Sequence, residues 1–249
     1  MFHSLQATLK REFSHGVQFQ AAYTWSKVMT TVQGTGQSAV FVGGSGNSND
    51  PNDRRQLWSP AGFDRTHRMV IVYLWRLPNP KGGAALVRLA GSNWSVSGVA
   101  TIQTGLPLTI TDSRGGSIFG FASTSRAELC PGVTYGDIST SGSAGSRVNG
   151  YFNPAAFCAV PVIGNGTGYG NSGAGIVRGP DQNNIDLSIT KTFTVAERHA
   201  FEFRSEFFNA LNHVQYSTPG TAFGTASFGV IGSTSVATRL IQFALKYNF

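Results

Sequence analysis

The last twelve residues, Thr238-Arg-Leu-Ile-Gln-Phe-Ala-Leu-Lys-Tyr-Asn-Phe249, carry an apolar side chain at every second position. Successive side chains of a β-strand point to opposite sides, so a period of two residues indicates a strand with one apolar face. On that face would lie Ile241, Phe243, Leu245, Tyr247 and Phe249. The stretch therefore predicts a β-strand that ends on an aromatic residue.

The same alternation recurs along the chain. One example is the segment 17–25, where Val, Phe, Ala, Tyr and Trp alternate with Gln, Gln, Ala and Thr. Together the alternating segments predict strands at about 2–12, 16–27, 66–77, 92–104, 183–194, 200–210 and 238–249. Residues 84–90 could form one or two helical turns. We therefore expect an all-β fold, an antiparallel meander of about seven strands.

The connections between these strands alternate in length. Short links fall at 13–15, 78–91 and 195–199, and long links rich in Gly, Ser, Asn and Pro fall at about 28–65, 105–182 and 211–237. A meander with short turns at one end and long loops at the other is typical of an outer-membrane barrel, whose strands need about 9–11 residues to span. A soluble β-sandwich also has alternating strands and stays open as an alternative.

Composition agrees with a membrane barrel. Only 12% of the residues are charged, against about 25% in an average soluble domain. No apolar run approaches the length of a transmembrane helix, which is about 20 residues, and residues 1–30 lack the apolar core of a secretory signal. The net charge is +7, but the basic residues are scattered and form no nucleic-acid motif, so we expect no nucleic-acid partner.

Several stretches together resemble a known family. The C-terminal stretch looks like the closing strand of bacterial outer-membrane barrels. Four further stretches resemble the carboxy-terminal part of TonB-dependent transporters of the Oar-like kind, which are common in acidobacteria and their relatives. They are residues 63–78 (beginning Phe-Asp-Arg-Thr-His-Arg), 105–110 (Gly-Leu-Pro-Leu-Thr-Ile), 183–192 and 203–213 (Phe-Arg-Ser-Glu-Phe-Phe-Asn-Ala-Leu-Asn-His). The order and spacing of these stretches carry the resemblance.

The resemblance implies a location in the outer membrane of Gram-negative bacteria and a role in importing a bulky nutrient. It implies a periplasmic C-terminus and a signal at Leu245, Tyr247 and Phe249 that the barrel-assembly machinery reads. It also implies a TonB-type energy complex and an unidentified nutrient ligand as partners of the full-length form.

This sequence differs from the family pattern on the amino-terminal side. Its members carry a signal, often a carboxypeptidase-regulatory-like domain, a plug and a 22-stranded barrel, and the first three are absent from residues 1–249. An odd strand number would put the two ends of the chain on opposite sides of the membrane, and bacterial single-chain barrels have even numbers. We therefore expect residues 1–249 to be the C-terminal segment of a larger barrel.

Charged residues on the predicted polar faces are candidates for the lumen wall. They are Asp186, Glu202, Arg204 and Glu206. They could line a substrate path, or they could pair with one another across strands or contact the plug. Aromatic residues near strand ends would lie in the interfacial girdles; they are Tyr23 with Trp25, Tyr73 with Trp75, and Tyr247 with Phe249.

No motif predicts catalysis or a cofactor. Residues 168–173 fit G-x-G-x-x-G but lie in a Gly-rich loop and not between a strand and a helix. Calcium binding by Asp50, Asp53 and Asp64 stays open, although their spacing is not that of an EF-hand. Cys130 and Cys158 could form a disulfide, as an oxidising compartment would favour, or remain two thiols. The pair Phe207-Phe208 breaks the alternation, which indicates a bulge or a strand end.

Two other functions remain open. The chain could be a structural or adhesive protein that presents the loops 28–65 and 105–182 at the cell surface, without transport. It could also be a soluble β-sandwich that binds a ligand.

Overall fold

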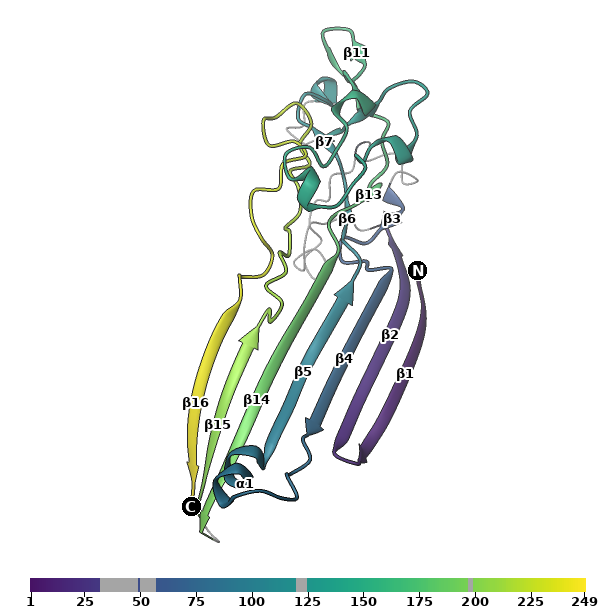
Figure 1. Ribbon diagram of the computed structural model, residues 1–249. Coiled ribbons are helices and arrows are strands. Elements are labelled where there is room, and N and C mark those ends of the chain that lie inside the picture. The colour runs from purple at the N-terminus through teal and green to yellow at the C-terminus, as the bar shows by residue number, and fades with distance from the viewer. Residues whose placement is uncertain (32–48, 50–56, 120–124, 197–198) are drawn as a thin grey trace.

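The computed structural model describes residues 1–31, 49, 57–119, 125–196 and 199–249. Seven long strands form one antiparallel sheet in the order β1-β2-β4-β5-β14-β15-β16 (Figure 1). Their bounds are β1 Phe2–Ser14, β2 Val17–Thr30, β4 His67–Arg76, β5 Trp94–Gln103, β14 Gln182–Ala196, β15 His199–Phe208 and β16 Leu240–Asn248. The predicted meander is confirmed, and strand ends differ from the sequence prediction by three residues at most.

Short connections lie at one end of the sheet and long ones at the other. His15 and Gly16, both at positive φ, make the tight turn between β1 and β2, a geometry that suits two-residue hairpins. The link between β4 and β5 contains the helix α1 (Ala85–Gly91), at the position where helical turns are predicted. Within the described residues, no helix combines the length and the apolar character needed to cross a membrane.

The sheet has one apolar and one polar face. Cross-strand registers place each residue of one strand on the same face as its partner, so the alternation of the strands continues across the sheet. The strand β4 is an exception, because Val70, Val72 and Leu74 lie on the polar face. The apolar face carries, among others, Leu5, Ala21, Ile71, Ala100, Leu187, Phe203 and Phe243; the polar face carries Gln6, Gln20, Ser97, Ser188, Arg204 and Gln242. Both faces come from local alternation in the sequence.

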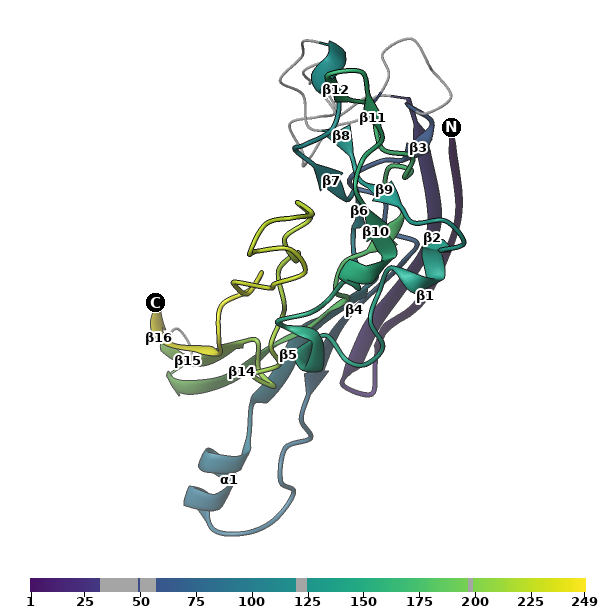
Figure 2. The same ribbon diagram turned by 90° about the horizontal axis from the view of Figure 1, so that it is seen from above.

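The sheet is curved, and β1 and β16 lie far apart at its two edges (Figure 2). In the part of the chain that the structure describes, each of these edge strands pairs with a single neighbour. The helix α1 stands out on the convex side of the curve (Figure 2). Its contacts, described below, are with side chains of the apolar face, so the apolar face is convex and the polar face is concave.

The buried core of the molecule lies in the long connections. We call residues 105–119, 125–181 and 211–237 the loop unit. It encloses an apolar cluster whose buried members are Ile110, Ala127, Ile138, Tyr151, Phe152, Ala156, Phe157, Val177 and Ile231. Ile231 comes from the connection between β15 and β16, so two connections that are distant in sequence share one core.

Short elements organise the loop unit and the rim. They are the strands β3 Ser59–Pro60, β6 Pro107–Leu108, β7 Thr111–Asp112, β8 Ser125–Arg126, β9 Glu128–Leu129, β10 Phe157–Cys158, β11 Val162–Ile163, β12 Gly166–Thr167 and β13 Val177–Arg178, and the 3-10 turns η3 Ser117–Phe119, η4 Tyr135–Asp137, η5 Gly145–Arg147 and η6 Pro154–Ala156. Seen from above, many of these segments lie over the concave side of the sheet, and others overlie the strands β1 and β2 at its edge (Figure 2).

Candidate functional site

A charged ladder lies on the polar face of β15. The Arg204 guanidinium donates to Glu202 Oε1 at 2.7 Å and lies 3.5 Å from Glu206 Oε1. These ion pairs run along one strand, between residues two positions apart, whereas the sequence analysis considered pairing across strands. All three side chains remain partly exposed, so solvent screens the pairs and they add little stability. Their main effect is to make the concave surface hydrophilic.

Asp186 lies on the same face but has a different role. Its Oδ1 accepts hydrogen bonds from the backbone N–H of Asn209 at 2.8 Å and from Asn184 Nδ2 at 3.0 Å. Asn209 follows the last residue of β15 and has a left-handed backbone, φ 50°. Asp186 therefore fixes the point where β15 ends. This strand end explains the broken alternation at Phe207-Phe208, and the ladder registers continue through both residues without a bulge.

A buried ion pair joins the sheet to the loop unit. The side chain of Asp64 is 0% exposed, and its Oδ2 accepts from Arg178 Nη2 at 2.5 Å. Its Oδ1 accepts from the backbone N–H of Val28 at 2.7 Å. Arg178 also donates to Thr66 Oγ1 at 3.0 Å. Three segments of the chain, the end of β2, the start of β4 and β13, thus meet at one carboxylate.

These contacts bear on the calcium hypothesis. Both carboxylate oxygens of Asp64 already accept hydrogen bonds from protein groups. Asp50 and Asp53 lie outside the described residues. Within the described ranges, no group of three or more His, Cys, Asp or Glu side chains is placed to hold a metal ion.

A second arginine, Arg65, lies at the mouth of the concave side. It donates to the carbonyl oxygen of Thr104 at 2.5 Å and to Gln182 Oε1 at 3.3 Å. Gln182 also accepts from Gln103 Nε2 at 2.5 Å. Burial lowers the pKa of the Arg65 guanidinium, and the positive charges of Arg68 and Arg178 lower that pKa further.

Two pockets lie where the loop unit meets the sheet. One, of about 220 Å³, is lined by Arg65, Gln182, Tyr216, Ser217 and neighbouring residues. The other, of about 430 Å³, lies between the start of β14 and the segment after β15, and Asn183, Asn212, His213 and Tyr216 are among its lining residues. Tyr216 is shared by both. The smaller pocket carries the guanidinium of Arg65, the amide of Gln182 and hydroxyl groups such as those of Tyr216 and Ser217, but more of its lining surface is apolar than polar.

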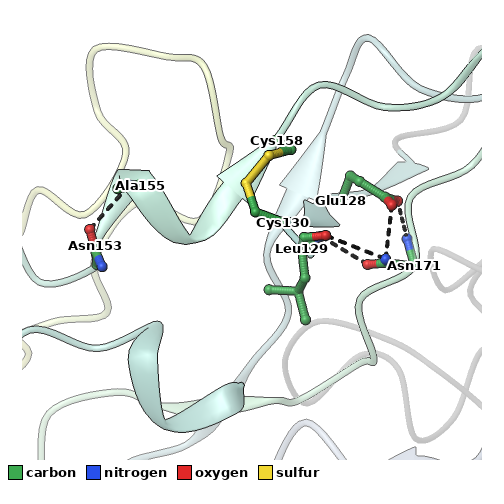
Figure 3. The surroundings of a disulfide bond; sticks show 7 residues. All are labelled: Glu128, Leu129, Cys130, Asn153, Ala155, Cys158 and Asn171. Carbon is green, nitrogen blue, oxygen red and sulfur yellow. Dashed lines mark hydrogen bonds between the residues drawn. A yellow bond between two sulfur atoms is a disulfide. The ribbon is translucent and has the colours of Figure 1, made fainter. Parts of the chain in front are cut away.

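Within the loop unit, the structure joins Cys130 and Cys158 in a disulfide (Figure 3). The bond links the residue after β9 to the second residue of β10, two strands that also pair through Phe157 and Leu129. On its other side, β9 is held by Asn171, which donates to both carboxylate oxygens of Glu128 at 2.8 Å and accepts from the Leu129 N–H at 2.8 Å (Figure 3). The strand is therefore fixed covalently on one side and by hydrogen bonds on the other.

A further ion pair lies in β7 and the turn that follows. The Asp112 side chain is 0% exposed and accepts a bidentate pair from Arg114, at 2.9 and 2.7 Å. Burial raises the pKa of this carboxyl group, but the hydrogen bonds and the charge of Arg114 outweigh burial, so the net pKa is lowered.

The residues of the expected assembly signal lie on the outer edge of the sheet. Leu245 is 70% exposed and Phe249 is 91% exposed. Tyr247 stacks on Phe249 with ring centroids 5.8 Å apart, and its hydroxyl lies 2.6 Å from His199 Nδ1. These side chains are on the apolar face of β16, open to contact from outside.

Charge on the apolar face is confined to its two ends. The middle of each strand carries aliphatic, aromatic or small residues, and basic side chains occur only near strand ends, at His3, Arg11, Lys27, His67, Lys191 and His199. Tyr23 and Trp25 lie near the long-loop end, and Trp75, Trp94 and Phe193 near the short-turn end. Two aromatic belts around an uncharged band are the pattern of a barrel wall in a membrane.

Several residues with clear structural roles were missed by sequence reasoning. Arg178 and Gln182 are separated by more than a hundred residues from their partners Asp64 and Arg65. Asn49 is buried and bonded to the backbone of Arg126 and Gly170. The run Phe-Asp-Arg-Thr-His-Arg at 63–68 was the one available signal, because it places an acidic residue and two arginines just before an apolar strand.

The antiparallel sheet is curved, with a convex apolar face and a concave polar face, and this arrangement is that of a wall of a membrane β-barrel. Residues 1–242 match the protein family described as outer membrane beta barrel domain. The chain belongs to this family, and so it is part of a bacterial outer-membrane β-barrel. Neither the search of curated proteins nor the search of solved structures gave a match.

Proposed function

We propose that the chain forms the wall, the rim and the external loops of a larger outer-membrane barrel that imports a bulky nutrient, of the TonB-dependent, Oar-like kind. In hydrocarbon every backbone N–H and C=O must be paired, so the open edges of β1 and β16 require further strands. Residues 1–249 would then be the C-terminal segment of that barrel, and its plug and amino-terminal domains would lie outside this segment.

The observation that carries this proposal is the continuous polar surface on the concave side. It runs from Gln103 and Gln182 at the mouth, past Ser188 on β14, to the Glu202–Arg204–Glu206 ladder. Because a barrel in lipid turns its apolar face outward, this polar surface would line the lumen. A hydrophilic wall of this kind is what passage of a polar solute needs.

The proposed orientation places the loop unit outside the cell and the short turns in the periplasm. The external loops would bind the nutrient, and a TonB-type energy complex would pull on the plug to open the lumen. No bond is made or broken in this mechanism, so the chain is not an enzyme. The barrel-assembly machinery would read Leu245, Tyr247 and Phe249, whose apolar side chains are presented at the edge strand.

A direct test removes the loop unit's first connection while keeping the sheet. The strands β6 and β13 pair through Leu108 and Val177, so the two ends of the 109–176 segment are already adjacent. Replacing residues 109–176 in the full-length protein by an Asn-Gly turn keeps Arg178, the partner of the buried Asp64, and should leave insertion intact but abolish energy-dependent uptake of the nutrient. Uptake that persists without the energy complex, or none in the intact protein across a panel of bulky nutrients, would contradict the transport proposal.

The second candidate function is surface display, and the loop unit itself favours it. A disulfide and a shared apolar core make the loops a stable folded surface, which an adhesive protein requires. In that case the deletion of 109–176 would abolish cell adhesion, and the intact protein would show no uptake.

The assembly role has its own test. Deleting Phe249 removes the most exposed apolar side chain of the C-terminal stretch and leaves the pairing of β15 with β16 unchanged. We expect slower insertion of the full-length barrel and accumulation of a protease-sensitive form in the periplasm. Truncating the exposed Val162 of the loop unit to Ala is a control that should insert normally.

A further inference from the structure

The helix α1 in the link between β4 and β5 is fastened to the apolar side of the sheet. Lys191 Nζ donates to the carbonyl oxygens of Leu89, at 2.6 Å, and Ser92. Trp94 Nε1 donates to the carbonyl oxygen of Ala90 at 2.7 Å. Lys191 and Trp94 are cross-strand partners on the apolar face. The C-terminal end of α1 is therefore held against the convex wall, which is the side on which Figure 2 shows it.

Lys191 differs from the other basic residues of the apolar face because it is buried. It is 2% exposed, and its ammonium group lies 4.9 Å from the ring centre of Phe193 and 5.5 Å from that of Trp94. The carbonyl groups at a helix C-terminus and the faces of aromatic rings both attract a cation. The ammonium group of Lys191 is thus bound by the end of α1 and by two aromatic rings, and these contacts account for the position of Lys191 on the apolar face.

The apolar side chains of α1 are left uncovered. Leu86 is 77% exposed, Val87 57% and Leu89 54%. On a helix these three side chains spread over one side, while Arg88 projects from the opposite side, and Lys81 precedes the helix. A short helix with an apolar side and basic flanking residues is typical of segments that lie in a membrane interface.

The position of α1 identifies what covers it. Its two attachment points, Lys191 and Trp94, lie in the aromatic belt at the short-turn end, which in a membrane barrel marks the level of the headgroups. The exposed leucines of α1 are thus continuous with the apolar band of the wall. The basic residues complement the phosphates of a phospholipid leaflet.

We propose that α1 is a membrane-interface anchor: Leu86, Val87 and Leu89 insert into the phospholipid leaflet at the short-turn end, Lys81 and Arg88 meet its phosphates, and Lys191 holds the helix at that depth. This rests on the proposed function in one respect, since it takes the short-turn end to be periplasmic, where the outer membrane presents phospholipid. The anchor would fix the depth of the wall in the membrane.

The test is the depth of a probe on α1 in the full-length protein. Cys130 and Cys158 are the two cysteines of residues 1–249 and form a disulfide, so Leu86→Cys introduces one free thiol in this segment for an environment-sensitive fluorophore, and any cysteine elsewhere in the full-length protein is replaced by serine. The vesicles are phosphatidylethanolamine and phosphatidylglycerol, with or without bromine on the acyl chains. Val162→Cys is the matched control, because Val162 is 78% exposed, as Leu86 is, but lies in the loop unit. Migration of unheated samples on gels confirms that both variants are folded.

We expect bromine to quench the probe at position 86 at least about twofold more than the probe at position 162. Lys191→Met should reduce that difference, because the helix loses its attachment. Equal quenching at the two positions would overturn the proposal. A blue-shifted probe that bromine does not quench, and that shifts back when the protein is diluted in lipid, would show that a second copy covers α1 and would overturn it too. The vesicle result does not depend on orientation, and cleavage of the loop unit by protease added to intact cells tests the proposed orientation separately.

Discussion

The disulfide between Cys130 and Cys158 should decide how firmly the loop unit is folded. The two cysteines are 28 residues apart, so reduction or removal frees a chain segment of that length. The chain-entropy relation for a loop of this size gives a loss of about 3.5 kcal/mol at 25 °C. Because about 1.4 kcal/mol corresponds to a factor of ten, the population of the locally opened loop should rise about 300-fold when both cysteines are replaced by alanine.

Trypsin can measure this opening. The Arg147 side chain, inside the closed segment, donates to the carbonyl oxygen of Thr140 at 2.7 Å and lies over the Tyr151 ring at 4.1 Å. Cleavage after Arg147 therefore requires local unfolding, and when opening is fast relative to cleavage the rate follows the open population. Cleavage after Lys81, which precedes α1 in the link between β4 and β5, serves as an internal control that should not change when the protein is in detergent.

The reasoning would be refuted by an increase of less than about tenfold at Arg147 in the double alanine variant. The intact protein treated with a reductant is a second comparison, since it loses the covalent link but keeps both sulfur atoms. If the variant were cleaved rapidly and the fully reduced protein were not, packing of the sulfur atoms, and not the covalent link, would be the cause.

Three further perturbations test other parts of the structure. Asp112 has a lowered pKa, so its stabilising effect is present above the unfolded-state pKa of about 3.9 and is lost as the pH falls through the lower folded-state pKa. We therefore expect pepsin to cleave the loop unit below about pH 4, and the rate of cleavage to depend less steeply on pH in Asp112→Asn. A Cβ at Gly98 would lie 2.5 Å from the Asp186 carbonyl oxygen, so Gly98→Ala should cost about 1–3 kcal/mol and reduce the folded fraction on unheated gels, whereas Gly82→Ala, with nothing within 4 Å, should not. Arg204→Met should change the free energy of unfolding by less than about 1 kcal/mol but increase the preference of the full-length barrel for cations in planar bilayers, and unchanged selectivity would argue against a lumen position.

The seven strands could be predicted because the evidence for each is local. Period-two alternation depends only on which residues follow one another, and it identified both faces of the sheet. The ends of strands were less predictable, since they depend on partners. The strand β2 extends to Thr30, beyond the predicted residue 27, because Met29 and Thr30 pair with β3, which the sequence did not indicate.

The loop unit could not be predicted in the same way. Its core joins Ile110 to Phe152 and Ile231, which share no periodic pattern and lie in Gly- and Ser-rich connections. The Asp64–Arg178 pair spans 114 residues. Cysteine content allowed a disulfide but left two free thiols as an alternative, and it took the folded positions of β9 and β10 to bring the two sulfur atoms together.

By itself, the sequence determined that this is a seven-stranded antiparallel sheet with one apolar and one polar face, because side-chain alternation in a strand fixes the face of every residue without reference to the rest of the chain. Only the tertiary structure decided which face is concave, how two distant connections fold into one loop unit, and that Lys191 holds α1 on the apolar side. Those features arise from contacts between segments far apart in sequence, and such contacts leave no local pattern to read.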